Sequence, residues 1–204
     1  RTPYVFVSPQ IEVIYIMEED CRGRRVLIEG RSKLRKLVRH RNIDIVFLMG
    51  FQVSLPVILM TTGEKCKYVF CDHEALLSRW HEKKVTLVRY LTAVLSNKIV
   101  TLTQQNTSDY ISKFKLSDKK VTYIYNSIDD KILLNTHEYD TESKIILSVG
   151  RFSPEKQYDL LVEIADRVLK RHPDWKWYIY GYGETFSEIE NKIRSLGMDK
   201  RIIL

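Results

Sequence analysis

The sequence predicts an α/β fold with two parallel sheets that follow one another along the chain. Short runs rich in Val, Ile and Tyr alternate with helical patterns, which is the order of βαβ units. This alternation loses its period over residues 127–143 and starts again at Lys144. The chain has 204 residues, 44% of them hydrophobic, which suffices for two small cores. We therefore expect domains at 1–128 and 144–204, joined by a connection at 129–143.

The first domain is expected to alternate strands and helices along its whole length. The strands are expected at 4–8, 11–17, 43–50, 67–71, 98–102 and 120–125, and the helices at 32–40, 54–60, 74–95 and 104–114. The segment 43–50 is an almost continuous apolar run, which predicts a strand buried on both faces. Pro56 lies early in the second helix. The third helix, long or broken, has Leu87, Leu91 and Val94 at helical spacing, and Thr103 is placed to cap the fourth.

The second domain repeats the pattern over a shorter length. Strands are expected at 144–150, at 175–181 and from residue 201, and helices at 158–170 and 186–196. Ser153 and Pro154 are suited to cap and begin a helix. Gly197 is placed to end the last one, because glycine readily adopts the left-handed conformation found at helix ends. A parallel strand normally leads into a crossover helix, so a strand at the end of the chain predicts a longer protein.

The chain is basic, with 33 Lys and Arg against 26 Asp and Glu and a formal net charge of +7. The basic residues concentrate between Arg22 and Arg41. Three interpretations of this cluster are open: a solvated helix face, a site that binds nucleic acid, or a contact with an anionic membrane surface. The membrane contact would use Arg24, Arg25, Arg31, Lys33, Arg35 and Lys36. Aromatic residues do not interleave with them, which disfavours base stacking, and no nucleic-acid partner is expected. The alternative to an enzyme is a non-catalytic basic protein that binds nucleic acid or an anionic surface.

Several classes of protein are excluded by what the sequence lacks. No apolar stretch reaches the roughly 20 residues that a membrane span needs. Cys21, Cys66 and Cys71 are odd in number and irregularly spaced. They therefore argue against a disulfide framework and favour the cytoplasm, with peripheral contact to the inner face of the membrane as an option. The absence of a Gly-x-Ser-x-Gly elbow and of a P-loop argues against serine hydrolases and P-loop nucleotidases.

Two loops of the second domain carry candidate binding residues. In an open parallel sheet, ligands bind at the carboxyl ends of the strands. The loop 150–156 has two cations beside an expected helix start, which suits a departing diphosphate, although an ordinary capped helix explains it too. The loop 181–184 has a Gly-x-Gly pattern that lets the backbone approach a ligand, or forms a plain tight turn. The candidate residues are Gly150, Arg151, Lys156, Gly181, Gly183 and Glu184.

Two loops of the first domain also follow strands. His73 comes directly after the strand 67–71, where the alternative is a helix start capped by Asp72 with an exposed histidine. Asn126 and Asp129 follow the strand 120–125 and are good turn residues, as a simple connection would also require. Neither the histidines nor the cysteines have the spacings of common zinc sites, so we expect no metal.

Taken together and in this order, these loops resemble those of the GT-B glycosyltransferases of family 4. The segment ILSVGRFSPEKQYDLLVEIADRVLKRHPDWKWYIYGYGE is similar to that family's strand, G-R-x-x-x-x-K-G, helix, strand and G-x-G pattern. VTYIYNSID resembles its V-x-x-I-x-N-G-I-D junction, and NKIVTLTQQNTSDYISKF resembles its A-D-x-V-I-x-x-S segment. VFCDHEALL resembles the loop whose histidine faces the cleft. The resemblance covers about residues 43–204.

The resemblance implies two Rossmann-like domains, the first on the acceptor side and the second binding a nucleotide sugar. It implies a retaining transfer of a hexose from a nucleotide-diphosphate sugar to a polysaccharide or lipid-linked acceptor, with no metal or other cofactor. The implied roles are diphosphate binding for Gly150, Arg151 and Lys156, proximity to the nucleotide for Gly181, Gly183 and Glu184, catalysis at the transferred sugar for His73, and a hinge-side turn for Asn126 and Asp129.

The sequence departs from the family's pattern at two glycines and at both ends. Gln157 and Ser127 stand where the pattern has glycine, and both are tolerated if the backbone there needs no positive φ. The family's first strand and glycine-rich acceptor-side loop would precede Arg1, and its paired glutamates would follow Leu204. We therefore expect this chain to be a fragment that does not bind donor normally by itself.

Overall fold

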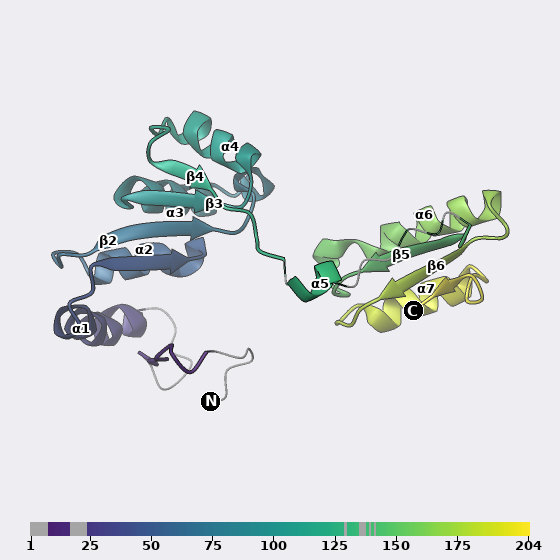
Figure 1. The fold of residues 1–204 in the computed structure, drawn as a ribbon, viewed down its shortest axis with the longest axis horizontal. Coiled ribbons are helices and arrows are strands. Elements are labelled where there is room, and N and C mark those ends of the chain that lie inside the picture. Colours follow the sequence, from purple (N-terminus) through teal and green to yellow (C-terminus); the bar gives the residue numbers. More distant parts are fainter. Residues whose placement is uncertain (1–7, 17–23, 129, 135–137, 139, 141) are drawn as a thin grey trace. The chain divides into compact units, whose positions relative to one another are not determined.

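The computed structural model describes residues 8–16, 24–128, 130–134, 138, 140 and 142–204. The chain divides into two compact units, Arg1–Ile128 and Asp129–Leu204, which we call unit 1 and unit 2 (Figure 1). Each unit contains a parallel sheet with its own hydrophobic core. The two parallel sheets with intervening helices confirm the predicted α/β class.

Unit 1 has a four-stranded parallel sheet in the order β1-β2-β3-β4. The strands are β1 Ile45–Met49, β2 Lys67–Asp72, β3 Lys98–Thr101 and β4 Val121–Tyr123, and the helices are α1 Arg24–His40, α2 Phe51–Met60, the 3₁₀ turn η1 Leu76–Arg79, α3 Lys83–Leu95 and α4 Gln104–Phe114. Spatial order equals chain order, so right-handed crossovers place α2, α3 and α4 on the same face. The core lies on that face, where Leu48, Phe70 and Ile99 pack against Ile58 and Tyr110.

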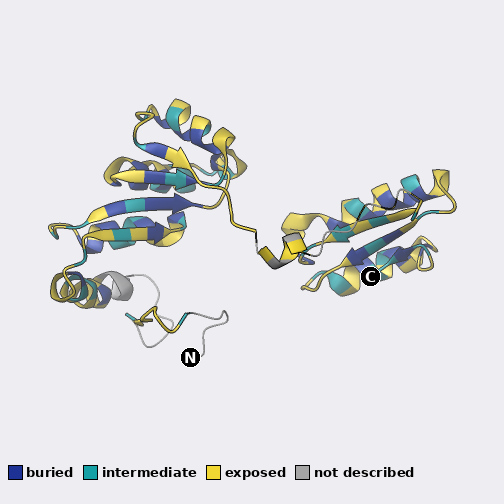
Figure 2. Cartoon of the chain, in the orientation of Figure 1, coloured by how far each residue is buried: buried dark blue, intermediate teal, exposed yellow. Residues whose placement is uncertain are grey.

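The other face of this sheet is open in the described part of the chain. Phe47 and Met49 of β1 are 64% and 55% exposed, and exposed residues alternate with less exposed ones along this strand in Figure 2. The prediction that this strand is buried on both faces is therefore wrong, because all three crossovers run in one direction and cover one side. The strand expected at 11–17 is also absent over residues 11–16, where Ile11 and Val13 are exposed. The strand expected at 4–8 falls on residues 1–7, outside the described part, apart from Ser8.

Unit 2 has a three-stranded parallel sheet in the order β5-β6-β7. The strands are β5 Ile145–Val149, β6 Lys176–Tyr180 and β7 Ile202–Ile203, and the helices are α5 Asp130–Leu134, the 3₁₀ turn η2 Pro154–Lys156, α6 Tyr158–Arg171 and α7 Phe186–Ser195. One face of the sheet packs Trp177, Ile179 and Ile202 against Val162 of α6 and Ile189 of α7. The short helix α5 lies in the segment 129–143, where a connection was expected.

Several helix boundaries have simple local causes. Gly50, with φ of 82°, allows the chain to turn sharply out of β1, so α2 begins at Phe51 and Pro56 lies in its interior rather than near its start. Thr103 caps α4 as predicted by accepting a hydrogen bond from the backbone N–H of Asn106 at 3.1 Å. Gly197 follows α7 with φ of 65°, which is the predicted helix end. Within the described residues, no helix has the length and apolar content to cross a membrane.

Candidate functional site

Two loops lie side by side at the carboxyl edge of the unit 2 sheet. The loop after β5 runs through Gly150 and Phe152, and the loop after β6 runs through Gly181 and Gly183. The backbone N–H of Gly150 donates to the carbonyl of Tyr180 at 3.0 Å, and the N–H of Phe152 donates to that of Tyr182 at 2.8 Å. The pairing of β5 with β6 thus continues into the loops and fixes them to each other.

The glycines of these loops are required by this close approach. A Cβ on Gly181 would lie 1.8 Å from the carbonyl oxygen of Gly150, and one on Gly183 would lie 2.1 Å from that of Phe152. Gly183 also has φ of 152°, near the edge of the range that L side chains rarely adopt. Packing between the loops therefore accounts for the Gly-x-Gly pattern without a ligand. A position near the nucleotide remains a prediction for Gly181, Gly183 and Glu184.

The two predicted diphosphate cations are both exposed on the loop after β5. Arg151, 65% exposed, forms an ion pair between its Nη2 and Oε1 of Glu155 at 2.8 Å. The pKa of Glu155 lies below its usual range, mainly because the Glu155 backbone N–H donates a hydrogen bond to the carboxylate and also because of the contact with Arg151. Lys156 has no ion pair within the described residues. A depression of about 370 Å³ beside them is lined by Arg151, Phe152, Ser153, Glu155 and Glu184.

The helix predicted after Ser153 is only the three-residue 3₁₀ turn η2, although Pro154 does occupy its first position. The α-helix α6 begins after Gln157, which has φ of 52° and ψ of 43°. The segment between Arg151 and Lys156 is therefore a 3₁₀ turn, and the α-helix starts only after both cations. Because the backbone at Gln157 is left-handed, glutamine is strained at this position, where the family's pattern has glycine. Ser127 has no positive φ, so the other departure carries no such cost.

In unit 1, His73 is the first residue after β2 and its side chain is exposed. The neighbouring Asp72 is 1% exposed and points inward. Its Oδ2 accepts a hydrogen bond from Oη of Tyr110 at 2.5 Å and lies 3.2 Å from Nε of Arg89. Asp72 does accept from the N–H of Glu74 at 3.2 Å, but no helix begins until Leu76. His73 therefore lies on a loop that begins at the buried carboxyl group of Asp72.

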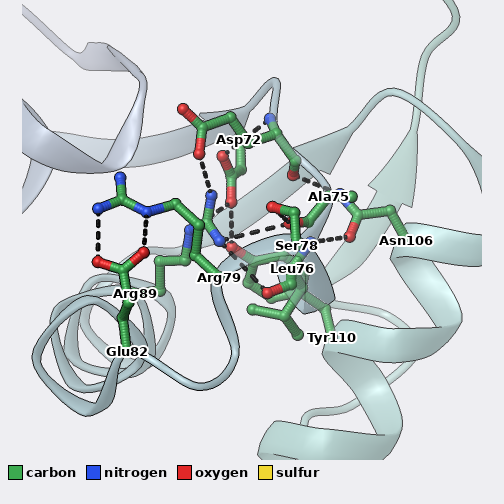
Figure 3. A network of polar contacts seen from close by, with 10 residues as sticks. Asp72, Ala75, Leu76, Ser78, Arg79, Glu82, Arg89, Asn106 and Tyr110 are labelled. Carbon is green, nitrogen blue, oxygen red and sulfur yellow. Dashed lines mark hydrogen bonds and ion pairs between the residues drawn. The ribbon is translucent and has the colours of Figure 1, made fainter. Parts of the chain in front are cut away.

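The side chains behind this loop converge from β2, α3 and α4, as Figure 3 shows for Asp72, Arg89, Asn106 and Tyr110. Burial raises the pKa of Asp72, while the hydrogen bond from Tyr110 and the charge of Arg89 oppose that change. Burial, together with the Asp72 charge, also raises the pKa of Tyr110, so Tyr110 stays a protonated donor at neutral pH. Sequence reasoning missed Arg89, Asn106 and Tyr110.

The remaining predicted residues of unit 1 are less organised. Asn126 is exposed beyond β4, and Asp129 lies outside the described residues, so the hinge-side turn stays a prediction. Among the described residues, no three His, Cys, Asp or Glu side chains are arranged to hold a metal ion. Cys66 and Cys71 are free thiols.

A hollow of about 480 Å³ lies away from the carboxyl edge of unit 1, at the start of β1 and β2. Its Glu64 side chain accepts hydrogen bonds from Nε of Arg35 at 2.6 Å and Nε of Arg39 at 2.7 Å. In open parallel sheets ligands bind at the opposite edge, so we assign this hollow a structural role. Arg35 is thus paired within the protein and 28% exposed, and membrane contact through the cations of α1 stays a prediction.

Comparison with known proteins identifies similar glycosyltransferases. Residues 129–204 match the family model described as glycosyl transferases group 1. An uncharacterized glycosyltransferase of Haemophilus influenzae is 27% identical over 201 residues, covering 98% of this chain and 56% of that protein. A poly(ribitol-phosphate) alpha-N-acetylglucosaminyltransferase of Staphylococcus aureus is 29% identical over 108 residues, covering 53% of this chain and 21% of its own length. The chain therefore spans about half, or less, of these relatives.

Solved structures agree with the sequence comparison. The crystal structure of TarM, a protein of S. aureus, is similar with a TM-score of 0.70 at 20% identity, covering 86% of this chain and 36% of that one. The pneumococcal O-GlcNAc transferase GtfA, in complex with UDP and GlcNAc, is similar with a TM-score of 0.62 at 17% identity, over 85% and 36% of the two chains. Residues 129–204 thus match the group 1 glycosyltransferases, and the fold of the chain is that of the GT-B glycosyltransferases.

Proposed function

We propose that the whole protein carrying this sequence transfers a hexose from a nucleotide-diphosphate sugar to a polysaccharide or lipid-linked acceptor, with retention at the anomeric carbon. The observation that carries this proposal is the pair of exposed cations Arg151 and Lys156 at the carboxyl edge of the unit 2 sheet. They lie in the segment matched by the group 1 family. Unit 2 is accordingly the nucleotide-sugar-binding domain and unit 1 the acceptor-side domain.

The cations have a defined chemical task in this reaction. When the bond to the donor sugar breaks, negative charge develops on the departing diphosphate, and fixed positive groups lower the barrier by stabilising it. Arg151 offers a planar fork for two phosphate oxygens, whereas Lys156 offers a mobile point charge. Binding requires Arg151 to exchange Glu155 for phosphate, which is easy at an exposed ion pair. These side chains supply the positive charge in the proposed reaction, which uses no metal.

UDP is the first nucleotide to test. TarM and GtfA have both been crystallised in complex with UDP, and the similar S. aureus protein described above is an N-acetylglucosaminyltransferase by name. We propose that Gly181, Gly183 and Glu184 lie near the nucleotide, and that His73 faces the transferred sugar as the catalytic residue. Its exposed position at the carboxyl end of β2 is the place where such sheets bind ligands.

We also propose that unit 1, the acceptor-side domain, contacts an anionic membrane. Arg31, Lys33 and Lys36 are exposed on α1, and Ile28, 71% exposed, lies beside them in a shallow depression that Arg31 and Lys36 also line. Each cation near an anionic surface contributes about 1 kcal/mol. Co-sedimentation with phosphatidylserine vesicles should fall with added salt and in the triple Ala variant. Binding that ignores both salt and lipid charge would contradict it.

The test of the donor site is calorimetric titration of the whole protein with UDP-, GDP- and ADP-sugars. Arg151→Ala and Lys156→Ala should each weaken donor binding by about 1.5–3 kcal/mol, which is roughly 10- to 150-fold. The matched control is Arg171→Ala, an exposed arginine at the far end of α6, which should bind donor normally. Unchanged affinity in both loop variants would refute the site. Salt-sensitive binding of arbitrary nucleic acid without any nucleotide-sugar binding would favour the non-catalytic alternative.

A further inference from the structure

The loop Asp72–Leu76, which carries His73, is held by two buried side chains, Asn106 and Arg89, to which the sequence alone assigned no role. We propose that Asn106 and Arg89 are positioning residues, which hold this loop so that His73 keeps one orientation toward the transferred sugar. The proposal rests on the proposed function, because it concerns the geometry of His73 in that reaction.

Asn106 forms hydrogen bonds to the loop through both the oxygen and the nitrogen of its side-chain amide. Its Oδ1 accepts from the backbone N–H of Leu76 at 2.8 Å, and its Nδ2 donates to the carbonyl of Glu74 at 3.0 Å. Asn106 is 6% exposed, and its own N–H is fixed to the cap residue Thr103. A side-chain amide used in this way replaces a strand partner for a loop that has left the sheet. The first turn of α4 therefore fixes the position of the loop Asp72–Leu76.

Arg89 holds the loop from the other side. Its Nη2 pairs with Oε2 of Glu74 at 2.8 Å, and its Nε lies 3.2 Å from Oδ2 of Asp72. Its Nη1 donates to the carbonyls of Ala75 at 3.4 Å and Leu76 at 3.3 Å. These contacts link the residues on both sides of His73 to one guanidinium.

The neighbouring loop is tied to the same point. The Arg89 guanidinium carbon lies 4.5 Å from the centroid of the Phe51 ring, which opens α2 after β1. The N–H of Gly50 donates to the carbonyl of Cys71 at 3.0 Å. Three successive loops at the carboxyl edge, after β1, β2 and β3, are thus joined around Arg89 and Asn106.

Burying a charge at this place is costly, which makes its location informative. Arg89 is 1% exposed, and an apolar side chain of similar volume would fill the same space without losing hydration. Only a guanidinium can donate in several fixed directions to the Glu74 carboxylate and two carbonyls at once, while its charge lies beside the Asp72 carboxylate. In this arrangement Arg89 holds the loop rigid, with His73 facing outward. A reacting group misplaced by about 1 Å costs on the order of 100-fold in rate, so such rigidity is a requirement of catalysis.

The test is a double-mutant cycle in the whole protein, with turnover followed as UDP released from a UDP-sugar. Asn106→Ala should lower kcat about 10- to 100-fold, with KM for the donor changed less than about twofold. In a His73→Ala background, the same substitution should lower kcat by less than about threefold, because there is no longer a histidine to position. Amide exchange of the segment 73–76 should rise in Asn106→Ala in either background.

Asn97→Ala is the matched control. Asn97 also fixes a backbone group of β2, accepting from the N–H of Tyr68 at 2.8 Å, but at the amino edge of the sheet. Its removal should leave kcat unchanged. If Asn106→Ala does not fold, Arg89→Lys is the second variant, because lysine keeps the charge but not the several directed donors.

The outcomes separate the two proposals. Equal losses of kcat from Asn106→Ala with and without His73, or unchanged exchange of the segment 73–76, would overturn the positioning role. No nucleotide-sugar binding and no turnover by the wild-type protein would instead overturn the proposed function. Normal turnover by His73→Ala would leave that function standing and remove the reason for the positioning, which would also overturn the inference.

Discussion

Unit 1 and unit 2 repeat the same order of strands and helices but use their arginines in opposite ways. Arg89 and its partner Asp72 in unit 1 are each 1% exposed. Arg151 and its partner Glu155 in unit 2 are 65% and 57% exposed. Both pairs stand at the carboxyl edge of a parallel sheet, so the difference is not one of topology. A buried cation has fixed partners and organises the polypeptide, whereas an exposed cation can exchange its partner for a ligand.

The energetics of the two pairs differ accordingly. An exposed ion pair is worth about 0–1 kcal/mol, because water solvates the separated charges almost as well. A buried pair contributes little beyond an apolar replacement, yet removing one partner strands the other charge in a medium that solvates it poorly. The contrast predicts that the same substitution, arginine to alanine, affects folding in unit 1 and ligand binding in unit 2.

The largest effect is therefore expected for Arg89→Ala. It should destabilise unit 1 by about 3–5 kcal/mol, because Asp72 and two carbonyls lose their partner. Arg151→Ala should change the stability of unit 2 by less than about 1 kcal/mol. Hydrogen exchange measured by mass spectrometry follows the two units separately and tests both. Comparable losses in the two variants would show that burial does not distinguish the pairs.

A substitution in unit 2 tests whether its loops are as firmly packed as the buried cluster of unit 1. Gly181→Ala should destabilise unit 2 by about 1–3 kcal/mol, since the new Cβ meets the backbone oxygen of Gly150, which cannot move aside cheaply. Gly197→Ala is the control, because a Cβ there meets no atom within 4 Å and only its φ of 65° is unfavourable. Thermal unfolding that ranks Gly197→Ala as the more damaging would contradict this account of the loops.

The two acidic partners should titrate with opposite sign. The pKa of Asp72 is raised, so its contribution to stability is present below its ordinary value of 3.8 and is lost as the pH rises through the raised value. The pKa of Glu155 is lowered, so its contribution is present above its ordinary value of 4.5 and is lost as the pH falls. Relative to the wild type, Asp72→Asn should therefore become more stable as the pH rises above 3.8, measured by exchange in unit 1. Glu155→Gln should become more stable relative to the wild type as the pH falls below 4.5, measured in unit 2, and relative stabilities that change in the same direction with pH would contradict the assignment.

The alternation of strands and helices was predictable because each element leaves a local pattern. The orientation of α3 was not. Leu87, Leu91 and Val94, whose spacing predicted the helix, are 56%, 37% and 45% exposed, while Arg89 and Thr92 are buried. Apolar spacing cannot show which side a helix buries when polar partners far along the chain decide it. The partners of Arg89 lie 13 or more residues earlier, at the end of β2 and just after it.

The candidate sites show the same division. Exposed cations and glycines follow strands, so Arg151, Lys156 and Gly181 were visible as a pattern in the sequence. Asn106 carried a weaker signal, since it lies three residues after the cap Thr103 and looked like an ordinary helix residue. Its buried position depends on the loop Asp72–Leu76 reaching across to it, which is a tertiary fact.

The smallest effect expected is a gain of stability in unit 2 from Gln157→Gly. Gln157 has φ of 52° and ψ of 43°, in the left-handed region, where its Cβ crowds the following backbone at a cost of roughly 1–2 kcal/mol. Glycine removes that crowding but loses more backbone freedom on folding, by roughly 0.5–1 kcal/mol, so a net gain of about 0.5–1 kcal/mol is expected. The matched substitution Ser127→Gly, where φ is not positive, should give no gain, since glycine then brings only its entropic cost. Thermal unfolding of both variants measures the difference, and a Gln157→Gly protein less stable than the wild type would show that the Gln157 side chain contributes more than the strain takes away.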